Sequence, residues 1–313
     1  MGQYFSRFLS GPLRKLERTT AVTAHPMDSM WRTFLKSLRR IIEFVVRAIQ
    51  LGPRHKNLLR HTRSLKATQG SRLALVLGNG PSISKLNPVE VSAHQRVNLD
   101  VFVVNWFPLS DLAKSITPNF IVLSDPAMAP SKVSDLRCSQ LWDYLSLHSE
   151  IKIVVPTSWS RYLDKDLNWS SRTIYFNDLG IEGLSKNIDP TKPRGYLSLT
   201  VYKALAMASY LGYRDISILG VDNTMFQGLS VTQDNDLMLG DKHFYAKQRP
   251  DQNMSNFYPN GVADFFYDIS LCFLHLRRCF GHLGNVYNLD GDSLVDCFSK
   301  LDRDFLTSTQ RFN

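Results

Sequence analysis

The chain has 313 residues, of which 43% are hydrophobic and 11% aromatic. This composition is typical of a globular protein, with room for one large domain or two modest ones. Four scattered cysteines form no C-x-x-C pair, which argues against a structural zinc site or a disulfide framework and fits a reducing cytosol. No run of 18 or more uninterrupted apolar residues and no secretory signal pattern occurs, so we expect neither a transmembrane helix nor a cleaved signal.

The net charge of +9 is unevenly spread along the chain. Residues 1–72 carry 15 Lys and Arg against 3 Asp and Glu, whereas the remaining 241 residues carry 22 against 25. The basic character therefore belongs to an N-terminal arm and not to the body. A body without a basic surplus does not predict nucleic-acid binding.

Within residues 1–70, the segment from Trp31 to Ile49 has apolar residues at helical spacing on one face and basic residues mostly on the other. This pattern is typical of a helix that lies in a membrane interface, where each basic residue near an anionic leaflet adds about 1 kcal/mol. We therefore expect residues 1–70 to form a basic amphipathic arm. It would hold the protein on the inner, cytoplasmic face of an anionic membrane. The alternative is a helix that packs on the body or at an interface in a homo-oligomer.

The first predicted strand of the body is the apolar run Leu73–Leu77, which leads directly into Gly-Asn-Gly-Pro-Ser at positions 78–82. Glycines in such a turn let the backbone approach a ligand closely, and a helix that begins near Ser82 would point its N–H groups at an anion. The spacing is not G-x-G-x-x-G, because position 83 is isoleucine. The segment predicts a nucleotide-binding strand–loop–helix unit. The alternative is the same local structure without a ligand.

Beyond this unit the body alternates apolar strands with helical segments. Such alternation predicts an α/β fold for residues 71–313, namely a doubly wound, mostly parallel Rossmann-like sheet. Further strands are expected at Asp100–Asn105, Phe120–Asp125, Ile151–Pro156, Asp215–Gly220 and about 285–289, and helices at Ser198–Leu211 and Val262–Cys279.

Polar side chains stand where four of the predicted strands end: Asn79, Asn105, Asp125 and Asp222. Ligands of doubly wound sheets bind beyond the carboxyl ends of the strands. Any one of these residues could cap a helix, as Asn and Asp often do. Four of them at strand ends indicate a shared binding site.

Residues 223–262 are polar and have little hydrophobic periodicity, so we expect an irregular lid inserted into the domain. His243 lies within this lid and is followed by two aromatic residues. A histidine in such a place is a candidate general base at neutral pH. The alternative is a solvated or hydrogen-bonded loop histidine without a catalytic role.

The order and spacing of these segments resemble the bacterial sialyltransferases of glycosyltransferase family 42. Those enzymes open with a strand that runs into Gly-Asn-Gly-Pro-Ser, identical here, and continue with an Asp-Val-Phe strand that ends in Asn, as at residues 100–105. Later motifs similar to those of the family follow at residues 125–126, 211–213, 220–222 and 292–295. The resemblance covers about residues 72–300. The same opening is shared with a broader group of bacterial glycan-associated proteins and with an archaeal-type hydroxymethylpterin pyrophosphokinase.

The resemblance implies an inverting transferase that moves sialic acid or a related acidic sugar from a CMP-activated donor, without a metal or other cofactor. The acceptor would be a cell-surface glycan such as lipopolysaccharide or capsule. His243 would take the proton of the acceptor hydroxyl, although Lys247 falls on the position of the family's base in a strict alignment. The substrate would be bound by Asn79, Gly80, Ser82, Asn105, Asp125, Ser198, Thr200 and Asp222.

One departure from the family concerns the leaving phosphate. The family binds it with tyrosines just after the strand that ends at Asp222, and this chain has none there. We expect Tyr245, Tyr258 or Arg194 to substitute for them.

Three other functions fit parts of the sequence. A metal-dependent transferase would need an Asp-x-Asp motif, and such motifs occur at residues 164–166, 234–236 and 290–292. A pyrophosphokinase would bind ATP and magnesium near Asp125 and Asp222. A non-catalytic subunit of the glycan machinery would bind a nucleotide without turning it over.

Overall fold

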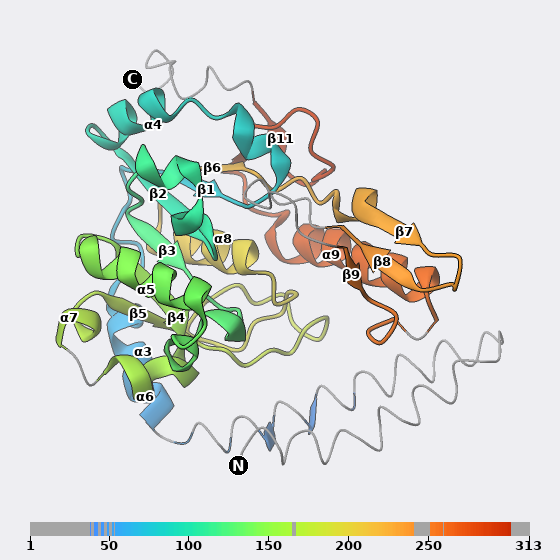
Figure 1. Ribbon diagram of the computed structural model, residues 1–313. Helices are drawn as coiled ribbons and strands as arrows, with labels where there is room; N and C mark the ends of the chain where they lie inside the picture. The colour runs from blue at the N-terminus through green and yellow to red at the C-terminus, as the bar shows by residue number, and fades with distance from the viewer. Residues whose placement is uncertain are drawn as a thin grey trace.

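The architecture is organised around a central parallel sheet, shown in Figure 1. The computed structural model describes residues 54–164, 167–240, 251–258 and 260–301, with single positions between 38 and 52. In this part of the chain the sheet has eight strands in the order β11-β10-β6-β1-β2-β3-β4-β5. Their bounds are β1 Leu73–Leu77, β2 Leu99–Val104, β3 Phe120–Val122, β4 Lys152–Pro156, β5 Thr173–Phe176, β6 Asp215–Leu219, β10 Val286–Asn288 and β11 Ser299–Lys300.

Every pairing in this sheet is parallel. The central strands are continuous apolar runs because both faces of the sheet are covered, and all six residues of β2 are buried. Alternate residues of β1 enter two different cores. Leu75 and Leu77 face one core, and Ala74 and Val76 face the other.

The connectivity places a topological switch point between β1 and β6. In chain order the sheet starts with β1, and β2 to β5 are added on one side of it. The chain then returns and places β6 on the other side of β1. Leu77 at the end of β1 is in register with Leu219 at the end of β6. In open α/β sheets, the crevice outside the carboxyl ends at such a point is where ligands bind.

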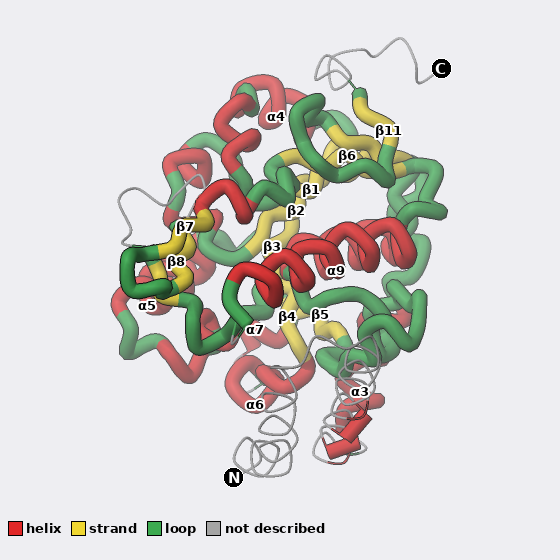
Figure 2. Tube along the Cα trace, turned by 90° about the vertical axis from the view of Figure 1, so that its right-hand side faces the viewer, coloured by secondary structure: helices red, strands yellow, loops and turns green. Residues whose placement is uncertain are grey.

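Helices cover both faces of the sheet, as the doubly wound fold requires. One face carries α4 (Pro88–Gln95), α5 (Leu136–Leu147), α6 (Ser160–Leu163) and, at its edge, α7 (Leu167–Ser170). The other face carries α8 (Thr200–Leu211) and α9 (Val262–Phe280), the long helix that crosses in front of the sheet in Figure 2. Helix α8 ends at Gly212, whose φ of +80° is the left-handed conformation that glycine adopts without strain.

The predicted fold class and the predicted strands and helices of the body are confirmed. The structure also contains elements that were not predicted, among them the edge strand β5 and the helix α5. One prediction was wrong, since no α-helix begins near Ser82. A 3-10 helix spans Pro81–Lys85, and the first α-helix of this unit, α4, begins only at Pro88. The reason is local, because Asn87 caps α4 by accepting a hydrogen bond from the Val89 N–H at 3.1 Å.

The lid is also more regular than the sequence indicated. It contains an antiparallel sheet of β7 (Leu229–Val231), β8 (Leu237–Leu239) and β9 (Gln252–Asn253). This sheet packs through Leu237 against Phe265 and Ile269 of α9 and so has a small core of its own. Strands of two or three residues are too short to show a period in the sequence.

Helix α3 (Arg54–Ser64) extends the body into the region that the charge pattern assigned to the arm. It packs on the edge strand β5, where Leu59 is 1% exposed and the Thr62 hydroxyl donates to the Tyr175 carbonyl at 2.6 Å. Most of the predicted amphipathic helix at residues 31–49 lies outside the described residues. No helix among those described is long and apolar enough to cross a bilayer.

Candidate functional site

The loop after β1 packs directly against the end of β6 at the switch point. A Cβ atom added to Gly78 would lie 2.1 Å from the Gly220 carbonyl oxygen, and one added to Gly80 would lie 1.9 Å from Asp222 Oδ2. The interpretation that these glycines admit a ligand therefore needs correction. They are required because the two loops of the protein approach each other this closely.

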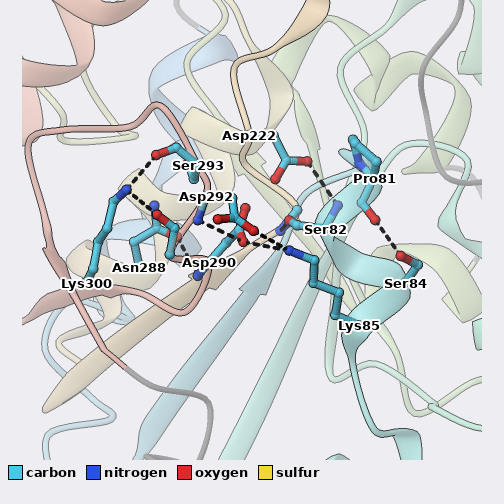
Figure 3. Close-up of polar contacts among 12 residues, drawn as sticks. Pro81, Ser82, Ser84, Lys85, Asp222, Asn288, Asp290, Asp292, Ser293 and Lys300 are labelled. Carbon is cyan, nitrogen blue, oxygen red and sulfur yellow. Dashed lines mark hydrogen bonds and ion pairs between the residues drawn. The ribbon is translucent and has the colours of Figure 1, made fainter.

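The N–H groups of the same loop are already used within the protein. The Gly78 N–H donates to the Leu219 carbonyl at 2.8 Å, and the Gly80 N–H donates to the Gly220 carbonyl at 2.8 Å. The Ser82 N–H donates to Asp222 Oδ2 at 3.2 Å, as Figure 3 shows, while its hydroxyl accepts from the Gly220 N–H. These three N–H groups are not available to a phosphate, so the expected anion site at this loop is not formed by them.

Unpaired oxygen atoms gather at the carboxyl ends of three adjacent strands. Asn79 Oδ1 after β1, Asn105 Oδ1 after β2 and Asp222 Oδ1 after β6 are buried, and none has a hydrogen-bond partner among the described residues. Asn79 and Asp222 are only 7% and 6% exposed. A buried polar atom without a partner costs about 1–3 kcal/mol. The unpaired Oδ1 atoms of Asn79 and Asn105 are acceptors, so a ligand group that binds them is a hydrogen-bond donor.

Two asparagines at these strand ends have a left-handed backbone. Asn105 and Asn223 both have φ of +53°. Asparagine tolerates this conformation better than other non-glycine residues. The turn at Asn105 directs the chain out of β2 while its N–H still donates to the Val122 carbonyl at 3.1 Å.

Asp222 belongs to a charged group that includes residues after β10. Lys85 Nζ lies 3.3 Å from Asp290 Oδ1 and 2.9 Å from Asp292 Oδ2 (Figure 3). Burial raises the pKa of Asp222, and the neighbouring Asp290 raises it further. Burial also acts to raise the pKa of Asp290, but the neighbouring Asp222 and Lys85 lower it overall. Asp290 therefore keeps its charge more readily, and Asp222 is the carboxyl that holds a proton more readily.

The residues after β10 also brace this edge of the sheet. The Ser293 hydroxyl donates to the Val221 carbonyl at 2.8 Å, and the Leu294 N–H donates to the Asp222 carbonyl at 3.2 Å. Asp290 was not predicted as a neighbour of Asp222, although it follows a predicted strand in the same way. The pairing of β10 with β6 is what brings the two carboxyls together.

A second polar region lies at the start of α8. The hydroxyls of Ser124, after β3, and Thr200 lie 2.7 Å apart, and Lys203 Nζ donates to Ser198 Oγ at 2.9 Å. Tyr202 of the same turn accepts from Asn223 Nδ2 at 3.3 Å. The start of α8 thus contacts the loops after both β3 and β6, and it presents hydroxyls and an amine. Lys203 was missed in the sequence because a single lysine in an apolar helix gives no signal of its burial.

The other predicted site residues are placed differently. Asp125 is exposed and caps a short 3-10 helix by accepting from the Ala127 N–H at 2.9 Å. Arg194 forms an ion pair with Glu182 at 2.7 Å and donates to the Asp178 carbonyl at 3.0 Å. Their roles toward a substrate stay predictions.

The predicted catalytic residues of the lid lie in a segment that the structure does not describe. His243 and Tyr245 lie outside the described residues. Tyr258 packs edge-on against Phe265 in the small core of the lid.

The Asp-x-Asp motifs do not form a metal site among the described residues, where no group of three His, Cys, Asp or Glu is arranged to hold an ion. The Asp236 carboxylate accepts from the Ser255 hydroxyl at 3.1 Å, and Asp164 accepts from the Tyr175 hydroxyl at 2.5 Å. Asp290 and Asp292 are occupied by Lys85.

Comparison with known proteins gives little at the level of sequence. No family model matches the chain. No curated protein matches it either. Among solved structures, it is similar to the MAf glycosyltransferase from Magnetospirillum magneticum AMB-1, with 15% identity and a TM-score of 0.42. The match covers 85% of this chain but only 42% of that protein. A likeness this distant does not identify a shared function or substrate.

Proposed function

We propose that this chain is a glycosyltransferase that uses a nucleotide-activated sugar. The observation that carries the proposal is the set of unpaired buried oxygens at the switch point, on Asn79, Asn105 and Asp222. The ribose and sugar of such a donor are rich in hydroxyl groups, which can donate to these acceptors. The position agrees with the rule that doubly wound sheets bind nucleotides beyond their carboxyl ends, where the strand order reverses.

The finer assignment rests on the resemblance to family 42. On that basis the donor is a CMP-linked acidic sugar such as sialic acid, and the acceptor is a glycan at the cell surface. The reaction inverts the anomeric centre by direct displacement, so the protein has to orient the acceptor and stabilise the departing phosphate. His243 is the proposed base, and Tyr245, Tyr258 or Arg194 is a proposed contact of the phosphate. The basic arm would hold the enzyme at the anionic inner face of the membrane, beside a lipid-linked acceptor.

Nucleotide binding by the full chain tests the proposal. Calorimetric titrations with CMP, CDP, UDP, GDP and ATP, each with and without magnesium, should show binding of CMP that does not depend on magnesium. Asn105→Ala should weaken this binding by about tenfold, because one donor–acceptor hydrogen bond is lost. The matched control Asn57→Ala, on the exposed surface of α3, should bind as the original chain does.

The other outcomes separate the alternatives. Magnesium-dependent binding of ATP would favour the pyrophosphokinase, and magnesium-dependent binding of UDP or GDP would favour a metal-dependent transferase. Nucleotide binding without transfer to any acceptor would favour a non-catalytic subunit. If no nucleotide binds, the proposal is wrong.

The role of His243 gives a separate prediction. His243→Ala should leave CMP affinity nearly unchanged and lower the rate of sugar transfer by roughly two or more orders of magnitude, since a general base contributes about that much. The rate is measured with saturating donor. Near-normal transfer would remove His243 from the mechanism and direct attention to Lys247.

A further inference from the structure

Lys203 is a lysine whose side chain is buried in the core beside α8. It lies in the first turns of α8, is 6% exposed, and makes no ion pair with a carboxylate among the described residues. Its ammonium donates to Ser198 Oγ at 2.9 Å and lies 5.5 Å from the centre of the Phe176 ring. One hydrogen bond and one aromatic ring satisfy only part of a group with three donors. An ammonium in such surroundings is costly to keep charged.

The charges around Lys203 do not compensate for this burial. Burial lowers the pKa of Lys203 to about 7, and Arg194 acts in the same direction. Glu182, Asp178 and Asp125 act in the opposite direction, but their effect is smaller. Glu182 is paired with Arg194 at 2.7 Å, and Asp178 accepts from the Thr157 hydroxyl at 2.8 Å. The lysine is therefore close to losing its proton at neutral pH in the free protein.

The hydrogen bond between Lys203 and Ser198 determines where the serine proton can point. While the ammonium donates to Ser198 Oγ, the hydroxyl proton of Ser198 has to be donated to another acceptor. Ser198 is exposed, so this donor faces outward. Next to it, Ser124 and Thr200 share one hydrogen bond at 2.7 Å, and the second of these two hydroxyl protons is also left to donate. The start of α8 therefore offers hydroxyl donors that face outward, with the buried Lys203 amine behind them.

The phosphate of a bound nucleotide needs hydrogen-bond donors, and the start of α8 provides them. The N–H groups of Gly78, Gly80 and Ser82 are used within the protein, and the unpaired buried atoms of Asn79, Asn105 and Asp222 at the switch point are oxygens, which do not donate to a phosphate. The start of α8 lies beside these acceptors, because Tyr202 contacts Asn223 after β6 and Thr200 contacts Ser124 after β3. The two regions are complementary to the two halves of a nucleotide, which are a hydroxyl-bearing ribose and an anionic phosphate.

We propose that Lys203, together with the Ser198 hydroxyl, binds the phosphate of the donor, and that phosphate binding places a proton on the Lys203 amine. The inference rests on the proposed function, since it locates the leaving phosphate of that reaction. A phosphate supplies the ionic partner that the buried amine lacks, so the charged form becomes the stable one. The proton comes from solvent when the donor binds. The ammonium then stabilises the charge that develops on the phosphate as the sugar leaves.

Proton uptake provides the test, because a merely structural lysine would not produce it. CMP and cytidine are titrated into the full chain at pH 8, in two buffers with different heats of ionisation. We expect close to one proton taken up per CMP and none per cytidine, because cytidine has no phosphate. CMP affinity should also fall by about tenfold per unit of pH between 8 and 9, since the free amine must be protonated against its lowered pKa.

Matched variants assign the proton. Lys203→Met keeps the length of the side chain and should bind cytidine normally, but it should bind CMP without proton uptake and without this dependence on pH. Lys192→Met removes an exposed lysine from the preceding loop and should behave as the original chain does. Normal cytidine binding shows that each variant is folded.

The failures of the two proposals are distinguishable. If CMP binds without proton uptake, or if Lys203→Met retains the uptake, the role of Lys203 is refuted while nucleotide binding stands. If neither cytidine nor CMP binds to the original chain, the proposed function is refuted and this inference with it.

Discussion

At Gly78 and Gly80 the close approach of the backbone was predicted correctly, but the group that it approaches was not. The sequence predicts that the backbone at these two residues lies close to a ligand. The structure shows that the close neighbours are Gly220 and Asp222, so the glycines join two loops of the protein. What remains for a ligand is the set of buried side-chain oxygens of Asn79, Asn105 and Asp222, which have no partner within the described part of the chain.

The steric reading of the loop gives a prediction for stability. Gly80→Ala should lower the free energy of unfolding by about 1–3 kcal/mol, because its Cβ would lie 1.9 Å from Asp222 Oδ2. The φ of Gly80 is −69°, so backbone strain does not contribute. Denaturant unfolding measures the effect, and Gly284→Ala, where no atom lies within 4 Å of the added Cβ, is the control. Equal stability of both variants would contradict the close packing.

Lys203 gives a prediction for the dependence of stability on pH. Its pKa in the folded protein is about 7, below that of an exposed lysine. At a pH between these two pKa values, the unfolded chain therefore binds more protons than the folded protein. Stability therefore rises with pH above 7, by up to about 1.4 kcal/mol per pH unit from this residue. Chemical denaturation at pH 7, 8 and 9 should show a shallower rise in Lys203→Met. An unchanged slope in the variant would mean that the lysine keeps its charge when folded.

At the scale of elements, three loops at the carboxyl edge of the sheet are joined by hydrogen bonds. The loop after β1 bonds to the loop after β6, and the residues after β10 bond to the same loop from the other side. Helix α8 completes the edge through Ser124 and Asn223. The lid has its own small core on α9, so its position depends on α9.

The packing of helix α3 gives a prediction for stability. Leu59→Ala should lower the free energy of unfolding by about 2–5 kcal/mol, because the side chain is 1% exposed against β5. Leu147→Ala is the matched control, since that leucine is 83% exposed. If the two substitutions have the same small effect, the helix belongs to the arm as the charge pattern indicated.

At the scale of the whole molecule, the charge asymmetry separates an N-terminal arm from a weakly acidic body. The structure assigns residues from 54 onward to the body, so the region left for membrane attachment is shorter than the 70 residues expected. Its apolar and basic faces remain a prediction, since they lie mostly outside the described residues.

Membrane attachment is tested in the full chain. Reversing Arg39, Arg40 and Arg47 to Glu should lower affinity for anionic vesicles by at least about 100-fold, at about 1 kcal/mol for each charge lost. Vesicle sedimentation with anionic and with neutral lipid measures the effect. Reversal of three exposed lysines of the body, Lys114, Lys132 and Lys192, is the control. Equal binding by all three proteins would refute the role of the arm.

The sequence by itself determined the fold class, the positions of most strands and helices, and the polar residues at the strand ends. These are local properties, because each depends on residues that are close together in the sequence. They are the period of the apolar residues and the residues that end an element. The edge strand β5 was missed for the same reason: four residues after a polar segment show no period.

Only the tertiary structure decided which of these residues form a site. The placement of β6 beside β1 brings Asp222 to Ser82 in the loop after β1, and the pairing of β10 with β6 brings Asp290 to Asp222. Burial of Lys203 in α8 changes its proton affinity, although its neighbours in sequence give no sign of this. Each of these effects depends on contacts between segments far apart in the chain. Such contacts set the environment of a side chain, and it is the environment that determines its charge and its free hydrogen-bonding capacity.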